Sequence, residues 1–320
     1  MDSSDAHARR REQARERQLR ARRARFAAVG SLLAVAVVAT ALVFAAAGSG
    51  PASHPLNASR KQTKGSASGR TSGSHGAAQL GTATVPILAY NVINASPPGS
   101  SAPAGLYVPA DEFSAQMDAL KAGGWHAVTL NQLEAYWTSG VSLGSGKPIV
   151  IMFDGGYASQ STTALPILQR LGWVAVENIQ VNGLSPSEGG LTDSQLRGLI
   201  AGGWELDTEG LDSADLTVLD SAQLGNQVTA ARQTLRSRYG VPVNWFCYPS
   251  GRYDATVIAA VRAAGFVGAT TIVPGWASPQ DDRFRLPRLQ VVGGTSASEL
   301  LSQIASAQGA TPPPTASAGT

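Results

Sequence analysis

Residues 148–173 read PIVIMFDGGYASQSTTALPILQRLGW, a short apolar run followed by a longer amphipathic one. The run 148–153 has the length and β-branched content of a buried strand, and Asp154 and two glycines follow it directly. The stretch 159–172 has helical character and ends on a glycine, the usual C-terminal stop of a helix. The segment therefore predicts one strand–helix unit with a carboxylate at the carboxyl end of its strand.

The same alternation of strand and helix continues in both directions over residues 85–307. It predicts an α/β fold, a distorted (β/α) barrel of about seven to eight parallel strands. A doubly wound open sheet is the alternative, but no G-x-G-x-x-G loop follows the first strand. The predicted strands are 85–90, 126–130, 148–153, 174–181, 204–208, 244–248, 267–273 and 288–292, and the clearest helices are 109–123, 159–172, 221–239 and 254–265.

The first 47 residues differ in composition from the rest. Residues 1–25 hold nine arginines against four acidic residues, and residues 26–47 carry no charge. A helix of about 20 apolar residues spans a bilayer, and positively charged flanks stay on its cytoplasmic side. We therefore expect a cytoplasmic segment 1–25, a single transmembrane anchor at 26–47 and an extracytoplasmic location for the remainder. A signal peptide cleaved near Ala45–Ala47 is the alternative.

The charge distribution argues against a nucleic-acid partner. The formal net charge is +3, but residues 1–25 alone contribute +5, so the rest of the chain carries −2. A nucleic-acid-binding domain needs its basic patch on the folded part. Residues 48–84 and 308–320 have the Gly-, Ser-, Ala-, Thr- and Pro-rich composition of a disordered linker and tail, which leaves 85–307 as the folded domain.

Cysteine and histidine are scarce. Cys247 is the one cysteine, which excludes an internal disulfide and a multi-thiolate metal cluster, and we expect it to be buried as a small apolar residue. The four histidines are His7, His54, His75 and His126. A His-rich metal site after residue 126 is therefore excluded.

Several segments of residues 85–307 resemble, in the right order, the polysaccharide deacetylase family (the NodB homology domain, carbohydrate esterase family 4). FDGGY at 153–157 resembles the first motif of that family, T-F-D-D-G-Y. The segment 107–130 resembles one typical of the biofilm-polysaccharide deacetylase branch. The other similar segments are the opening strand (85–93), the helix before the second motif (191–206), the third-motif region (246–266) and the closing strand (283–291).

The resemblance implies a distorted barrel, usually of seven strands, and metal-dependent removal of N-acetyl groups from glycans. In the family, one Asp acts as base on a metal-activated water, while a second Asp and two His hold the metal. The base maps onto Asp154, but the metal-binding Asp maps onto Gly155 and the two His map onto Glu209 and Ser213. Two further family positions, a His and a Tyr, hold Asn91 and Ser250. We therefore expect no metal site of the family's usual kind.

Asp154 and the nearby acids leave several interpretations open. Asp154 either keeps a residual function or caps the turn that follows it. Asp207, Glu209 and Asp212 can bind a hard cation such as Ca²⁺ or Mg²⁺ through oxygen. Alternatively, Asp154 and Glu209 can act as paired acid and base on a glycosidic bond. The remaining interpretation is an acidic, solvated rim without chemistry.

Three further side chains are candidates for contact with a glycan. Arg252 and Tyr248 lie in the third-motif region, and Trp276 lies in the loop PGWASP. Two of them have a simpler alternative: a solvated arginine for Arg252, and packing in a core or loop for Trp276. Trp204 has the same two interpretations, with core packing favoured.

The sequence thus supports three functional hypotheses. The first is a membrane-anchored, deacetylase-like domain without the usual metal site that acts on or binds cell-envelope polysaccharide or peptidoglycan. The second is an active carbohydrate hydrolase, either a deacetylase with an oxygen-ligated metal or a glycosidase using Asp154 and Glu209. The third is a protein-interaction module of the envelope.

Overall fold

The computed structural model describes residues 79–98 and 103–308. The predicted anchor at 26–47, most of the predicted linker and almost all of the predicted tail lie outside these residues. No helix within the described part of the chain is long and apolar enough to cross a membrane. Two residues assigned to the linker, Gly81 and Ala83, hydrogen-bond to Tyr136, because the chain there lies along a helix instead of leaving the domain.

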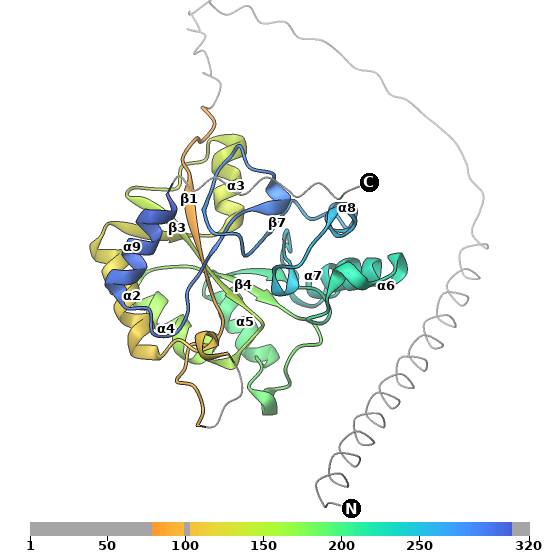
Figure 1. Ribbon diagram of the computed structural model, residues 1–320, viewed down its shortest axis with the longest axis horizontal. Coiled ribbons are helices and arrows are strands. Elements are labelled where there is room, and N and C mark those ends of the chain that lie inside the picture. Colours follow the sequence, from red (N-terminus) through yellow and green to blue (C-terminus); the bar gives the residue numbers. More distant parts are fainter. Residues whose placement is uncertain (1–78, 99–102, 309–320) are drawn as a thin grey trace, which may run out of the picture. The chain divides into compact units, whose positions relative to one another are not determined.

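Nine described strands form one sheet at the centre of the molecule, and all but β8 run parallel (Figure 1). Seven of them follow one another in the spatial order β7, β6, β5, β4, β3, β1 and β9. A backbone pairing of Thr270 with Leu286 links β7 to the segment that leads into β9. The predicted distorted (β/α) barrel is therefore confirmed. The strands are β1 (Val85–Tyr90), β2 (Trp125–Val128), β3 (Lys147–Asp154), β4 (Val176–Ile179), β5 (Glu205–Thr208), β6 (Trp245–Cys247), β7 (Gly268–Thr270), β8 (Trp276–Ala277) and β9 (Leu289–Gln290).

Helices surround the strands in Figure 1. The four predicted from periodicity are confirmed, although two of them contain a π-helical turn, at Gln160–Ala164 and at Asn226–Ala230. Thr129 and Ser296 form capping boxes at the start of two helices that periodicity did not reveal, α3 and α9. The helices are α2 (Ala110–Ala122), α3 (Leu130–Ser139), α4 (Leu165–Leu171), α5 (Asp193–Ala201), α6 (Ser221–Gly225), α7 (Ala231–Tyr239), α8 (Ala255–Ala263) and α9 (Ala297–Ala307).

Strand side chains alternate between two hydrophobic clusters, as the period of two requires. On β1, Val85 and Ile87 belong to a smaller cluster that also contains Trp245 of β6 and Trp137 of α3. Leu88 and Tyr90 belong to a larger cluster that packs the strands against the helices. Because the strands are parallel, their carboxyl ends meet at one end of the barrel, where (β/α) barrels assemble their functional residues.

Candidate functional site at the carboxyl end of the barrel

Polar side chains end four neighbouring strands. Asp154 is the last residue of β3, Asn178 lies near the end of β4, Glu209 follows β5 directly, and Cys247 ends β6. Backbone pairing sets Asp154 opposite Asn178, so that the residues after each strand reach the same region. Ligand atoms of Asp154, Glu209 and Cys247 lie within 4.8 Å of one another. We call the group formed by Asp154, Asn178, Glu209, Cys247 and Arg288 the carboxyl-end cluster.

Asp154 is held by a buried cation. Its Oδ1 accepts hydrogen bonds from Arg288 Nη1 at 2.9 Å and from Asn178 Nδ2 at 2.8 Å. Arg288 is 1% exposed, and its Nε donates to the carbonyl oxygen of Thr271. Burial by itself lowers the pKa of Arg288, but the negative charge of Asp154 more than compensates, so the pKa is raised and the guanidinium stays charged. The ion pair fixes the orientation of the Asp154 carboxylate.

Glu209 has the opposite electrostatic character. Burial and the charge of Asp154 raise its pKa to about 8, so the protonated form predominates at neutral pH. Its Oε2 accepts a hydrogen bond from Gln180 at 3.0 Å, and the thiol of Cys247 approaches its Oε1 at 3.7 Å. Cys247 is buried, as predicted, and burial raises the pKa of its thiol. At neutral pH the carboxyl-end cluster therefore contains one carboxylate and one guanidinium, and its net charge is near zero.

Three further acids are buried outside this cluster. Glu177 on β4 is 1% exposed, and burial raises its pKa well above the usual range, although the backbone N–H of Gly156 partly offsets this shift. On β5, burial raises the pKa of Asp207 and of Glu205, and their proximity favours a single negative charge for the pair. Asp207 Oδ1 accepts hydrogen bonds from the backbone N–H groups of Asn244 and Trp245, at the start of β6.

The three acids suggested as a hard-cation site have different surroundings. Asp207 is fully buried and holds the start of β6, whereas Glu209 lies beside Cys247 at the end of that strand. Asp212 is exposed and accepts a hydrogen bond from Gln227. Ser213, at a family metal-ligand position, is also exposed.

The glycan-contact candidates are likewise dispersed. Arg252 is 65% exposed and forms an ion pair with Asp215. Tyr248 is 1% exposed, stacks on Tyr253 and donates its hydroxyl to the carbonyl oxygen of Phe284, so it offers no free group to a ligand. Trp204 is buried and stacks on Phe153, which confirms core packing.

Trp276 does not lie at the carboxyl end. It begins β8, whose residues pair with Val85 and Pro86 at the start of β1. The start of β1 lies at the opposite end of the barrel from Asp154, because β1 and β3 are parallel. Trp276 therefore lies far along the barrel from the carboxyl-end cluster.

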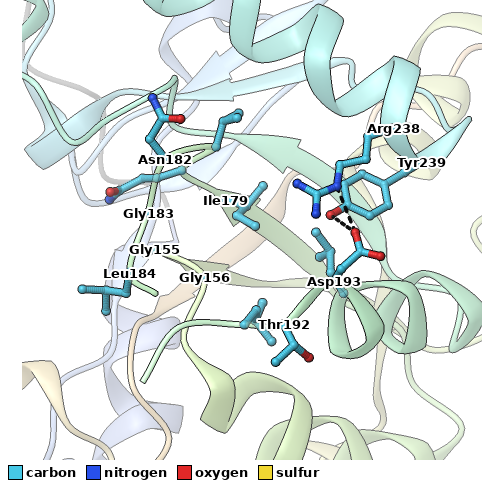
Figure 2. Close-up of a pocket in the computed structure, with 14 residues that line it drawn as sticks. Gly155, Gly156, Ile179, Asn182, Gly183, Leu184, Thr192, Asp193, Arg238 and Tyr239 are labelled. Carbon is cyan, nitrogen blue, oxygen red and sulfur yellow. Dashed lines mark hydrogen bonds and ion pairs between the residues drawn. The ribbon is translucent and has the colours of Figure 1, made fainter. Parts of the chain in front are cut away.

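A cavity of about 190 Å³ opens beside the carboxyl-end cluster (Figure 2). Gly155 and Gly156, which follow Asp154 in the chain, and Gln180, which donates to Glu209, are among its lining residues, although no member of the carboxyl-end cluster lines the cavity itself. At the opposite side, Asp193 accepts hydrogen bonds from Arg238 and Tyr239, as the dashed lines in Figure 2 show. Amide, aromatic and charged groups thus surround a small space next to the cluster.

The sequence interpretation missed four polar residues of this region: Asn178, Gln180, Glu177 and Arg288. Each had a recognisable signal, because each is a polar residue inside or at the edge of a predicted apolar strand. Arg288 opens the run RLQVV, and a charged residue is fully buried only when it is paired. Its partner lies 134 residues away, beyond the reach of local pattern reasoning.

Comparison with known proteins identifies the domain. Residues 143–269 match the family model described as Polysaccharide deacetylase. YxkH of Bacillus subtilis, a protein named as a polysaccharide deacetylase, is 26% identical over 216 residues, which cover 68% of this chain and 74% of that protein. The chain carries a polysaccharide deacetylase domain.

Solved structures with deacetylase names have the same fold as this polysaccharide deacetylase domain. Streptococcus pyogenes deacetylase PplD, solved in complex with acetate, superposes with a TM-score of 0.64 at 23% identity, covering 70% of this chain and 99% of that one. BA0330 of Bacillus anthracis gives a TM-score of 0.62 at 25% identity, covering 70% and 69% of the two chains. The fold is therefore that of known deacetylases.

Gly155, which the sequence analysis aligned with the metal-binding Asp of the family, has a backbone conformation typical of glycine. Gly155 has a φ of 96°, a conformation that L side chains rarely adopt. A Cβ atom at this position would lie 2.7 Å from Cε2 of Tyr157, so the ring of Tyr157 borders the space that a side chain would need. In this polysaccharide deacetylase domain, both the backbone conformation and the position of the Tyr157 ring thus favour a glycine at residue 155.

Proposed function

We propose that this chain is a membrane-anchored, extracytoplasmic protein whose polysaccharide deacetylase domain binds cell-envelope glycan without metal-dependent deacetylation. The observation that carries the proposal is the surroundings of Asp154. Arg288 forms an ion pair with Asp154. Gly155, which aligns with a metal-binding Asp of the family, has a positive φ that disfavours an Asp at this position. Asp154 therefore has an orienting partner, while Gly155, the next residue in the chain, offers no side-chain ligand atom.

The donors present do not fit the family's divalent metal. The family needs one carboxylate and two imidazoles, and here Gly155, Glu209 and Ser213 occupy those positions. Asp154, Glu209 and Cys247 do converge, but Glu209 and Cys247 favour their protonated forms, and a metal ligand must be deprotonated. The guanidinium of Arg288 adds a positive charge beside the same site, which opposes binding of a second cation.

Binding of glycan is supported by the fold and by the polar cavity beside the cluster. The relatives and structural neighbours are named for deacetylases of polysaccharides, and their fold positions loops around the carboxyl end of the barrel. The cavity lined by Gly155, Gln180 and Tyr239 offers backbone, amide and aromatic groups, the mixture that small-molecule sites use for orientation. The arginine-flanked apolar run 26–47 supports tethering to the membrane.

The test combines three measurements on the purified full chain. We expect no stoichiometric divalent metal in elemental analysis, no acetate release from chitin oligosaccharides or peptidoglycan, and measurable binding of the same glycans in calorimetric titration. Stoichiometric zinc together with acetate release lost in Asp154→Asn contradicts the loss of deacetylation. Absence of binding to every envelope glycan tested contradicts the glycan-binding part.

A second candidate function is hydrolysis of a glycosidic bond by Asp154 and Glu209. It is favoured by one observation: Glu209 has a pKa of about 8, and a protonated carboxyl lies within 4.8 Å of a carboxylate that an arginine orients. Retaining glycosidases use such a pair, with carboxyl groups about 5–5.5 Å apart. Reducing-sugar release that disappears in both Asp154→Asn and Glu209→Gln supports this function, and an absence of release from a panel of envelope glycans contradicts it.

A further inference from the structure

A groove of about 590 Å³ opens at the amino-terminal end of the barrel. Trp125 begins β2, Lys147 begins β3 and Trp276 begins β8, and all three line the groove together with α9. The parallel strands end at the carboxyl-end cluster, so this groove lies at the other end of the barrel from Asp154. It shares no lining residue with the cavity beside that cluster.

Two tryptophans give the groove its shape. The rings of Trp125 and Trp276 meet edge to face, with centroids 5.9 Å apart and an angle of 65° between their planes. The indole N–H of Trp276 donates to the carbonyl oxygen of Ile304 on α9, which fixes that ring. Both side chains are only partly buried. Two indoles at an angle, one of them fixed by a hydrogen bond, suit a rigid ligand with flat apolar faces, and the C–H faces of pyranose rings are of this kind.

The charge of the groove is of one sign, positive. Lys147 is the one charged residue among the described lining residues, and none of them is acidic. Its ammonium lies 5.5 Å from the ring centroid of Trp125 and donates to the carbonyl oxygen of Gly123 at 3.1 Å. The ammonium has further donors that can meet an anion within the groove. A single lysine is a point charge, so it suits one isolated carboxylate. Phosphate sites typically use several cationic groups or the forked guanidinium of an arginine, and the groove has neither among its described lining residues.

We propose that this groove is a second glycan-binding site, which takes a polysaccharide bearing one carboxylate close to a pyranose ring. Glycan strands of peptidoglycan have this chemistry, because every second sugar carries a lactyl carboxylate once the peptide is removed. The inference rests on the proposed function, since both assign an envelope glycan as ligand. It adds a second binding site and the requirement that the bound glycan carries a carboxylate. Neither involves the residues of the carboxyl end.

The experiment compares two probes on the full chain by calorimetric titration: peptide-free peptidoglycan glycan strands, and chitin oligosaccharides of the same length without the lactyl group. We expect Lys147→Gln to weaken binding of the strands about fivefold and to leave chitin binding unchanged, because it removes one exposed charge interaction. Lys147→Arg keeps the charge and retains affinity for the strands. Lys121→Gln is the matched control, because Lys121 is exposed and lies over Trp173 in the same way, outside the groove.

Equal affinity of the wild-type chain, Lys147→Gln and Lys121→Gln for the strands overturns the proposal, and so does equal affinity of the wild-type chain for both probes. If chitin binds to all variants, and the strands bind with the same affinity to the wild-type chain and to Lys147→Gln, the proposed function stands and only the groove assignment fails. If neither probe binds the full chain, both fail.

Discussion

At the carboxyl end of the barrel, Arg288 is 1% exposed and donates to Asp154, whereas at the amino end Lys147 is exposed and lies over Trp125. Both are cations beside the groups that define their site. Buried Arg288 donates to Asp154 and to the carbonyl oxygen of Thr271, whereas exposed Lys147 keeps donors for a ligand. In this polysaccharide deacetylase domain, the charged side chains Asp154 and Arg288 at the carboxyl end pair with each other, while the opposite end presents partly exposed aromatic rings.

The comparison shows that burial determines what a charged residue can do. A buried ion pair loses the hydration of both charges, and removing one partner leaves the other uncompensated in a medium of low polarity. An exposed lysine loses little hydration and contributes little to folding, so it remains available for binding. The carboxyl end and the amino end should therefore respond very differently to mutation.

The largest expected effect comes from Arg288→Met. Asp154 then keeps Asn178 as a partner but loses its countercharge, so we expect the free energy of unfolding of the full chain to fall by about 3–5 kcal/mol. Urea denaturation followed by circular dichroism measures the change. Arg252→Met is the control, since that arginine is 65% exposed, and it should change stability by less than about 0.5 kcal/mol. Similar losses in the two variants would remove the distinction between the buried and the exposed ion pair.

The second effect concerns the glycine after Asp154. We expect Gly155→Ala to cost about 1–3 kcal/mol, because the residue has a φ of 96° and a Cβ atom would contact the Tyr157 ring. Gly198→Ala in α5 is the control: its Cβ meets no atom within 4 Å, so the variant should be stabilised by up to about 1 kcal/mol. We also expect Gly155→Asp to acquire no metal in elemental analysis. An unchanged stability of Gly155→Ala would show that the backbone there tolerates a side chain.

The third effect is a pH dependence at the carboxyl end. The pKa of Glu209 is about 8 in the folded chain and about 4.3 when unfolded, so the folded state holds an extra proton between these values. Its contribution to stability therefore falls, by about 1.4 kcal/mol per pH unit, as the pH rises from about 4.5 to 8. Glu209→Gln should remove this part of the slope in denaturation series over that range.

The control for this titration is Glu299→Gln. The pKa of Glu299 is lowered by hydrogen bonds from Ser296, so its contribution is lost only as the pH falls into the acid range. The slope between pH 5 and 8 should therefore be unchanged in Glu299→Gln. A Glu209→Gln variant with the slope of the wild-type chain would contradict a protonated Glu209 in the folded state.

The smallest effect is expected at the amino end. Lys147→Gln should leave the free energy of unfolding within about 0.5 kcal/mol of the wild-type value, because the lysine is exposed and its hydrogen bond to Gly123 is on the surface. Tryptophan fluorescence should nevertheless change, since the ammonium lies over the Trp125 ring. A large loss of stability would mean that Lys147 has a structural role and would weaken the contrast between the two ends.

Much of the fold was predictable because strands and helices leave local patterns. The run 85–90 coincides with β1, and the apolar run that precedes Asp154 lies within β3. Helix α3 was missed because only its capping box, from Thr129 to Gln132, marks its start, and its neighbour β2 runs directly into it. The position of Asp154 at a strand end was also predictable, since it follows from one continuous stretch of chain.

The partners of the candidate residues were not predictable in this way. Sequence spacing placed Asp207 and Glu209 on the same side of the chain, yet one pairs with Glu205 and the start of β6 and the other with Gln180 and Cys247. Trp276 was assigned to a glycan contact from its loop, and the register of β8 on β1 then placed it at the amino end. Strand register across a barrel is a long-range property that a local pattern does not contain.

Residue identities alone established the strand–helix alternation and the family resemblance, and they predicted that an Asp and two His are missing from the metal-ligand positions. These inferences depend only on which side chains exist and on spacing along a few turns or strands. The tertiary structure alone brought Arg288 to Asp154 across 134 residues, raised the pKa of Glu209 and joined Trp125 to Trp276. Burial and electrostatic coupling arise between segments distant in the chain, and they exist only once those segments are packed together.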